Sequence, residues 1–188
     1  MNPSKFTRRE FLALVGGVTA LSVTGLVLHP QSISAEVRPP GALAPNELFR
    51  AACLRCGKCV SACPHQTIRQ NNERLPYIDG INGWCFFCMD CGIACPTGAL
   101  RPVDPHSTKL GTAIIDRARC LAWTHLECHA CYDQCVKLKQ AITLDAQKRP
   151  LVDLKRCNGC GACVTVCPQS NLEGRSKEFG KAVALVAD

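Results

Sequence analysis

The sequence predicts an α+β fold made of two small tandem domains, each built from short hairpins and short helices. Three observations lead to this prediction. Sixteen of the 188 residues are cysteines, these cysteines fall into four similar runs, and the segments between runs have the alternating pattern of short hairpins. Because each half contains only about 70 residues, its apolar core is too small for stability. We therefore expect cross-links of another kind to hold the fold together.

The cysteine repeat dominates the chain after residue 50. Three runs have the spacing C-x2-C-x2-C-x3-C-P, whereas the third run has seven residues between its first two cysteines and Val136 after its last. In chain order, the runs are Cys53, Cys56, Cys59 and Cys63; Cys85, Cys88, Cys91 and Cys95; Cys120, Cys128, Cys131 and Cys135; and Cys157, Cys160, Cys163 and Cys167.

This spacing is typical of bacterial ferredoxins, in which cysteine thiolates bind [4Fe–4S] clusters. Three thiolates on a tight loop bind one cubane, and the fourth, which we expect at a helix start, binds the neighbouring cluster. A disulfide framework and zinc sites are weaker alternatives, because disulfide scaffolds have irregular gaps and zinc sites use separated C-x2-C pairs. The sequence therefore predicts four [4Fe–4S] clusters with all sixteen cysteines as ligands, in bacterial-ferredoxin-like dicluster domains.

The connecting segments divide the chain. Residues 67–69 and 76–79 flank one polar turn, and residues 141–144 and 150–153 flank another, so each pair predicts a hairpin. The outer gaps between runs contain 21 residues each and the middle gap contains 24. We expect a leader (1–35), a linker (36–52), a first dicluster domain (53–107), a second (108–175) and a C-terminal tail (176–188).

Two pairings of the runs remain open. In the tandem pairing the first run shares its clusters with the second, and the third run with the fourth. In the nested pairing the first run joins the fourth and the second joins the third. Residues 111–116 also read as a strand, which is compatible with either pairing. The tandem ligand sets are Cys53, Cys56, Cys59 and Cys95; Cys85, Cys88, Cys91 and Cys63; Cys120, Cys128, Cys131 and Cys167; and Cys157, Cys160, Cys163 and Cys135.

The N-terminal segment predicts export. Arg8 and Arg9 precede a mildly apolar stretch, 12–28, and a small-residue segment ends at Ala35. Twin arginines before a weakly apolar run are typical of the Tat signal, and an ordinary Sec signal is the alternative. Clusters are assembled on reduced thiols in the cytoplasm, so export of the folded protein to the periplasm suits this chemistry. The leader is either cleaved near Ala35 or retained as an anchor.

The charge does not predict binding to nucleic acid. The formal net charge of +7 counts every cysteine as neutral. Four clusters of about −2 each would make the protein acidic. The chain also lacks a basic stripe with interleaved aromatic residues. No phosphate loop, nucleophile motif or apposed carboxylate pair is present, so we expect no catalytic residues.

Beyond its cysteines, the chain resembles the NapG/MauM family of ferredoxin-type proteins. The resemblance rests on the twin-arginine leader, residues 38–42 (RPPGA), Phe49 leading into 53–57 (CLRCG), and the wide third run followed by 141–144 (AITL). It implies a periplasmic electron-transfer subunit beside a membrane-embedded iron–sulfur partner that oxidises quinol. Electrons would pass to a periplasmic acceptor, such as nitrate reductase, or serve methylamine metabolism. An iron–sulfur subunit of another exported oxidoreductase, and a maturation or scaffold protein, are the alternatives.

Overall fold

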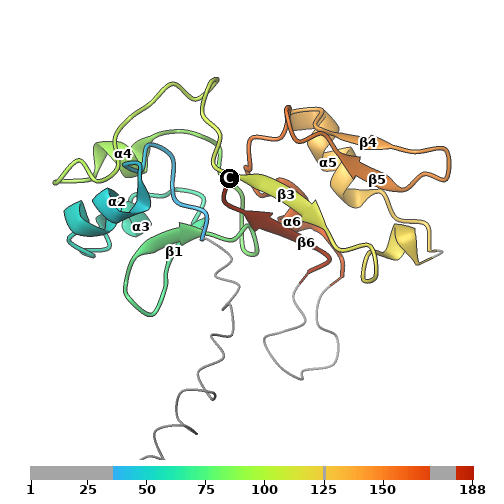
Figure 1. Cartoon of the computed structure of the whole chain (residues 1–188), viewed down its shortest axis with the longest axis horizontal. Coiled ribbons are helices and arrows are strands. Elements are labelled where there is room, and N and C mark those ends of the chain that lie inside the picture. The colour runs from blue at the N-terminus through green and yellow to red at the C-terminus, as the bar shows by residue number, and fades with distance from the viewer. Residues whose placement is uncertain (1–35, 125, 170–180) are drawn as a thin grey trace, which may run out of the picture. The chain divides into compact units, whose positions relative to one another are not determined.

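Two antiparallel hairpins follow the first and third cysteine runs (Figure 1). Strands β1 (Ile68–Gln70) and β2 (Pro76–Ile78) form the first, with Ile68 opposite Ile78. Strands β4 (Ile142–Leu144) and β5 (Pro150–Val152) form the second, with Ile142 opposite Val152. Both hairpins were expected from the sequence and are confirmed.

In both hairpin turns a side-chain oxygen accepts hydrogen bonds from backbone N–H groups of the turn. The side-chain oxygen of Asn71 accepts hydrogen bonds from the backbone N–H groups of Glu73 and Leu75. Asp145 accepts equivalent bonds from Gln147 and Arg149. Asn and Asp favour turns because their short side chains satisfy backbone donors two to four residues on. Local chemistry therefore accounts for both turns.

The computed structural model describes residues 36–124, 126–169 and 181–188. They belong to one compact unit, Ser34–Asp188. The expected leader, 1–35, lies outside the described residues, as do 170–180 of the expected second domain and tail.

A third sheet joins segments that are far apart in the sequence. Strand β3 (Thr112–Ile115) pairs antiparallel with β6 (Val183–Val186), so that Thr112 lies opposite Val186. The strand expected around 111–116 is confirmed. The C-terminal segment, expected as a tail, supplies the strand that completes this sheet.

The helices are short. They are α2 (Asn46–Ala52), α3 (Lys58–Ser61), α4 (Asp90–Ile93), the 3-10 helix η1 (Leu121–Trp123), α5 (Ala130–Leu138) and α6 (Ala162–Val166). The third cysteine of every run is the second residue of a helix. The expectation that the fourth cysteine begins a helix is wrong, because Cys63, Cys95 and Cys167 lie at or just beyond a helix end and Cys135 lies inside α5.

In the part of the chain that the structure describes, no helix has the length and apolar character needed to cross a bilayer.

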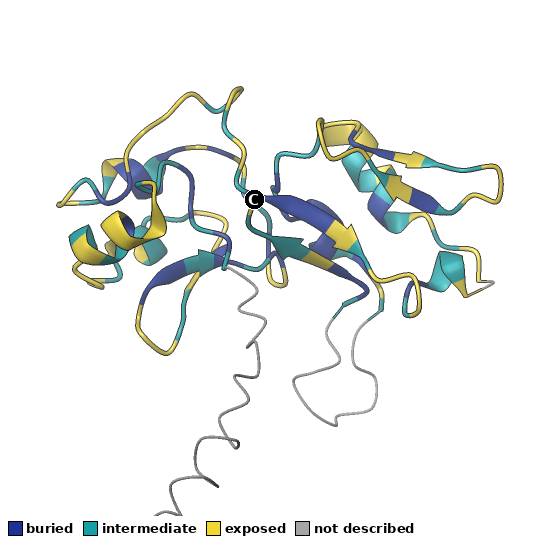
Figure 2. Cartoon of the chain, in the orientation of Figure 1, coloured by how far each residue is buried: buried dark blue, intermediate teal, exposed yellow. Residues whose placement is uncertain are grey.

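Two apolar clusters form the core. Figure 2 shows in dark blue where buried residues lie along the chain. The first cluster contains Phe49, Leu75 and Leu100 together with Cys91, and the second contains Ile142 and Val183 with buried cysteines. Residues 36–52, expected as a linker, belong to the first cluster through Val37 and Phe49, because their apolar side chains fill a core that would otherwise be too small. Backbone bridges fix this segment, joining Val37 to Ile78 and Ala42 to Leu100.

Candidate functional site

The sixteen cysteines line four cavities, four cysteines to each. Each cavity combines the first three cysteines of one run with the fourth cysteine of another. The sets are cavity 1, Cys53, Cys56, Cys59 and Cys95; cavity 2, Cys63, Cys85, Cys88 and Cys91; cavity 3, Cys120, Cys128, Cys131 and Cys167; and cavity 4, Cys135, Cys157, Cys160 and Cys163. The first run thus shares its cavities with the second, and the third run with the fourth.

Left-handed backbone conformations shape these loops. Helices α3, α4 and α6 each begin after a residue with positive φ, namely Gly57 at 76°, Met89 at 66° and Gly161 at 88°. This conformation turns the chain sharply between the second and third cysteines of a run. Glycine adopts it without strain, which accounts for two of the three positions.

Backbone N–H groups point at several of the sulfurs. Arg55 donates to the Sγ of Cys53 at 3.4 Å, and Phe87 donates to that of Cys85 at the same distance. The fourth cysteines receive bonds from later residues: Leu100 donates to Cys95 at 3.4 Å, and Ala141 to Cys135 at 3.3 Å. Donors in these positions stabilise negative charge on sulfur.

Two threonine hydroxyls add to this set. The Oγ1 of Thr67 lies 3.1 Å from the Sγ of Cys63, and that of Thr97 lies 3.7 Å from the Sγ of Cys95. Burial raises the pKa of the Cys63 thiol, but hydrogen bonds from Thr67 and from nearby backbone groups outweigh burial and lower it overall. The pKa of Cys95 is lowered in the same way by Leu100 and Thr97.

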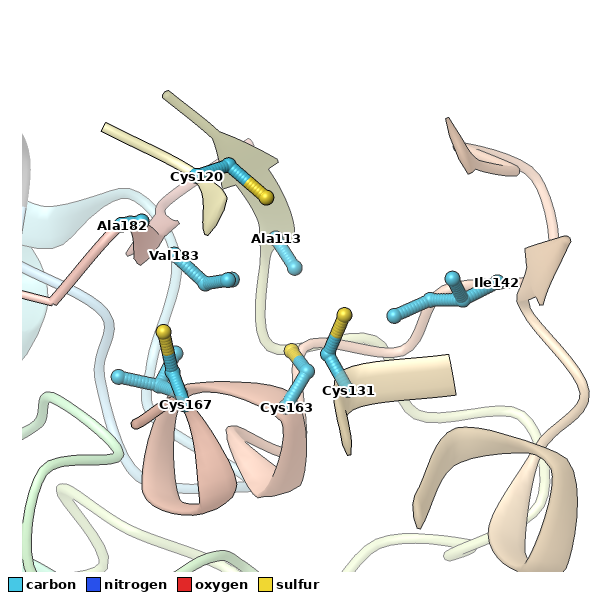
Figure 3. Close-up of a cluster of buried hydrophobic side chains, with 9 residues drawn as sticks. Ala113, Cys120, Cys131, Ile142, Cys163, Cys167, Ala182 and Val183 are labelled. Atoms are coloured by element: carbon cyan, nitrogen blue, oxygen red, sulfur yellow. The ribbon is translucent and has the colours of Figure 1, made fainter. Parts of the chain in front are cut away.

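Two other thiols, those of Cys91 and Cys131, have a raised pKa. Burial, followed by the neighbouring thiols, raises the pKa of Cys131 to about 12. Cys91 also reaches about 12, through burial and then the charge of Cys85. Figure 3 shows Cys131 beside Cys163 in the core of the second half, where both are buried. Four thiolates of like charge cannot share a partly buried cavity unless a positively charged group compensates them.

The donor set of each cavity therefore fits an iron–sulfur cluster. Four thiolates are the ligand number of a [4Fe–4S] cubane, and the N–H donors match the sulfur hydrogen bonding that such clusters receive. All sixteen cysteines are free, so each is available as a ligand. Among the described residues, no three His, Cys, Asp or Glu side chains lie close enough together to hold a single metal ion.

Comparisons with known proteins agree with this chemistry. Residues 50–100, which span the first two runs, match the 4Fe-4S dicluster domain, and residues 148–169 match a 4Fe-4S binding domain. The chain is 34% identical to the ferredoxin-type protein NapG of Escherichia coli K12, over 85% of this chain and 78% of that protein. It is 38% identical to the methylamine utilization ferredoxin-type protein MauM of Methylorubrum extorquens, over 88% and 86% respectively.

The chain belongs to the NapG/MauM family of ferredoxin-type proteins. The ferredoxin-type protein NapF of Escherichia coli K12 is also similar, at 32% identity over 71% of this chain and 81% of that protein. No solved structure matches the chain.

The wide third run of this NapG/MauM-family chain has a structural explanation. Its extra residues include η1, and two guanidinium groups lie over the ring of Trp123. Those of Arg117 and Arg149 are each 4.3 Å from the ring centroid. The hydroxyl of Thr124 donates to the carbonyl oxygen of Cys120, which closes the turn. The insertion therefore covers cavity 3, which Leu121 lines.

Sequence reasoning about this NapG/MauM-family chain missed the threonines. Thr67 and Thr97 follow the fourth cysteine of their runs by four and two residues, and that position was the available signal. It also missed the arginine pair around Trp123, because Arg117 and Arg149 lie 32 residues apart in the sequence.

Proposed function

We propose that this protein holds four [4Fe–4S] clusters, one in each cavity, with the sixteen cysteines as ligands. The tandem pairing of the runs follows from the same proposal. The observation that carries it is the presence of four cysteine sulfurs around every cavity, three from one run and one from its neighbour. When bound, such a cluster supplies reversible one-electron chemistry.

The chain's own residues bind and shield these groups. The thiolates hold the iron, and the N–H donors on the sulfurs favour the more negative state and so help to set the potential. Apolar side chains exclude water: Phe49 and Leu100 line cavity 1, and Val183 lines cavity 3. No catalytic residue is needed for electron transfer of this kind.

The cellular role that we propose is a relay in the periplasm. Electrons would arrive from a membrane-embedded iron–sulfur protein that oxidises quinol and leave towards a periplasmic redox acceptor. The relatives support this role, since they are ferredoxin-type proteins and one group is named for methylamine utilization. The Arg8-Arg9 leader supports Tat export.

The relay is tested with quinol and membranes. EPR spectra of the clusters should show reduction when quinol is added to membranes that contain the quinol-oxidising partner. Membranes without that partner are the control and should give no reduction. Reduction without any partner would contradict the relay in favour of a self-sufficient enzyme, and clusters that quinol never reduces would favour a scaffold.

Export is tested with the variant Arg8→Lys/Arg9→Lys, which keeps the charge of the leader. Tat recognition requires the arginines, so we expect this variant to load iron normally and to remain in the cytoplasmic fraction. Unchanged recovery in the periplasm would contradict Tat export.

A further inference from the structure

The two cysteine-rich halves of the chain meet at a backbone hydrogen bond between two ligand residues. The N–H of Cys85 donates to the carbonyl oxygen of Cys160 at 2.8 Å. Cys85 lines cavity 2 and Cys160 lines cavity 4. A path of covalent bonds with one hydrogen bond therefore connects a ligand sulfur of cavity 2 to a ligand sulfur of cavity 4.

A pair of glycines lets the backbones approach at this place. A Cβ added to Gly80 would lie 2.9 Å from the carbonyl oxygen of Gly161 and 3.1 Å from its Cα atom. Gly80 also has a φ of 73°, which disfavours any side chain. The hydroxyl of Thr165 donates to the carbonyl oxygen of Gly80 at 2.7 Å and fixes the contact.

Side chains close the contact on another side. The ring of Phe87, between two cysteines of cavity 2, is buried, and the ammonium of Lys139 lies 5.9 Å from its centroid. Lys139 itself lines cavity 4. Residues beside cavity 2 therefore contact residues beside cavity 4 in two ways, by a backbone hydrogen bond and by a cation–π contact between side chains.

Within each half, neighbouring cavities share a cysteine run. Cys59 on α3 lines cavity 1, while Cys63, just beyond the same helix, lines cavity 2. In the second half, Cys131 and Cys135 both lie on α5 and line cavity 3 and cavity 4 respectively. Helices α3 and α4 pack together, as do α5 and α6.

We propose that the four cavities form one linear series in the order 1, 2, 4, 3, and that the Cys85–Cys160 contact is the junction through which electrons cross between the two halves. This inference rests on the proposed function. One electron crosses the junction at a time: the group held by Cys85 is oxidised as the group held by Cys160 is reduced, or the reverse. No bond forms or breaks and no proton moves. The quinol-oxidising partner is the source of electrons and the redox acceptor is their destination.

Two matched variants test the order. Cys56 and Cys88 are the second cysteines of their runs and are both exposed. Cys56→Ala should empty cavity 1 and Cys88→Ala should empty cavity 2, each with the loss of about four irons. The double variant Cys56→Ala/Cys88→Ala gives the reference EPR spectrum of the second half alone, that is, of the clusters in cavities 3 and 4.

The readout is magnetic coupling between clusters in the reduced protein. In Cys88→Ala, the signals of the second half should match those of the double variant, because the cluster nearest to it has been removed. In Cys56→Ala, these signals should keep the splitting and fast relaxation of the wild-type protein. The reverse pattern, or second-half signals that never respond to the first half, would overturn the proposed order.

A glycine variant tests the junction with all ligands in place. Gly80→Ala should retain full iron and the coupling within each half, but weaken the coupling between halves, because the added methyl group pushes the backbones apart. Gly98→Ala is the control, since it has a similar φ of 69° and a Cβ there would meet only the Arg101 side chain, at 3.5 Å. Equal coupling in the two variants would contradict the junction. A wild-type protein with far fewer than about sixteen irons would contradict the proposed function itself.

Discussion

The guanidinium of Arg149 lies over the ring of Trp123, 4.3 Å from the ring centroid. Arg149 directly precedes β5 and closes the β4–β5 turn, because its Nε donates a hydrogen bond to the Asp145 carboxylate at 2.8 Å. Trp123 belongs to the insertion that widens the third cysteine run. The contact therefore ties that insertion to the second hairpin.

Replacing Arg149 should loosen this connection. Arg149→Ala removes a cation–π contact and a partly exposed ion pair, so we expect the free energy of unfolding to fall by about 1 kcal/mol. Arg149→Lys keeps the charge but not the planar stacking, so its effect should be smaller. The measurement is the urea concentration at which cluster absorbance and circular dichroism are half lost. Identical midpoints for wild type and Arg149→Ala would contradict this role.

Phe49 should contribute far more to stability than its neighbour in α2. The side chain of Phe49 is 0% exposed and that of Leu48 is 54% exposed. Phe49→Ala should cost about 3–5 kcal/mol because it leaves a cavity in the core. The control Leu48→Ala should change stability by less than about 0.5 kcal/mol. Denaturant titration of both variants checks this difference, and equal effects would show that 36–52 is not part of the core.

The Thr67 hydroxyl should raise the potential of the cluster in cavity 2. Its hydrogen bond to Cys63 favours the reduced, more negative state. If the bond is about 1 kcal/mol stronger in that state, Thr67→Val lowers the potential by about 40 mV. Thr67→Ser retains the hydroxyl and is the control. Potentiometric titration followed by EPR measures both, and a potential that Thr67→Val leaves unchanged would refute the assignment.

Removing the clusters should unfold the protein. The apolar cores are small, and buried cysteines make up a large part of the second. Without iron the thiols of each cavity lose the group that cross-links four points of the chain. We expect a chelator with an oxidant to abolish the circular dichroism of helices and hairpins together with the cluster absorbance. Native circular dichroism in an iron-free, fully reduced sample would contradict this dependence.

The sequence predicted those features that depend on local chemistry. The hairpins follow from the polar turns at 71–73 and 147–149, and the cysteine runs follow from a repeated spacing. The role of Phe49 was missed because the short segment around it does not reveal what its ring packs against. The fourth cysteine was placed at a helix start because spacing alone does not show where the first helical turn begins.

Contacts between distant segments could not be predicted. Cys85 and Cys160 are 75 residues apart in the sequence, and nothing in either run indicates that their backbones meet. The same holds for Gly80 and Gly161, whose need for glycine becomes evident only when each is seen against the other. The pairing of β3 with β6 likewise depends on where the chain returns after the fourth run.

Iron and acid-labile sulfide content, determined on anaerobically purified protein, tests the central claim most directly. Four [4Fe–4S] clusters require about sixteen irons and sixteen sulfides per chain. A colourless, natively folded sample that contained no iron and held its cysteines in eight disulfides would contradict the account.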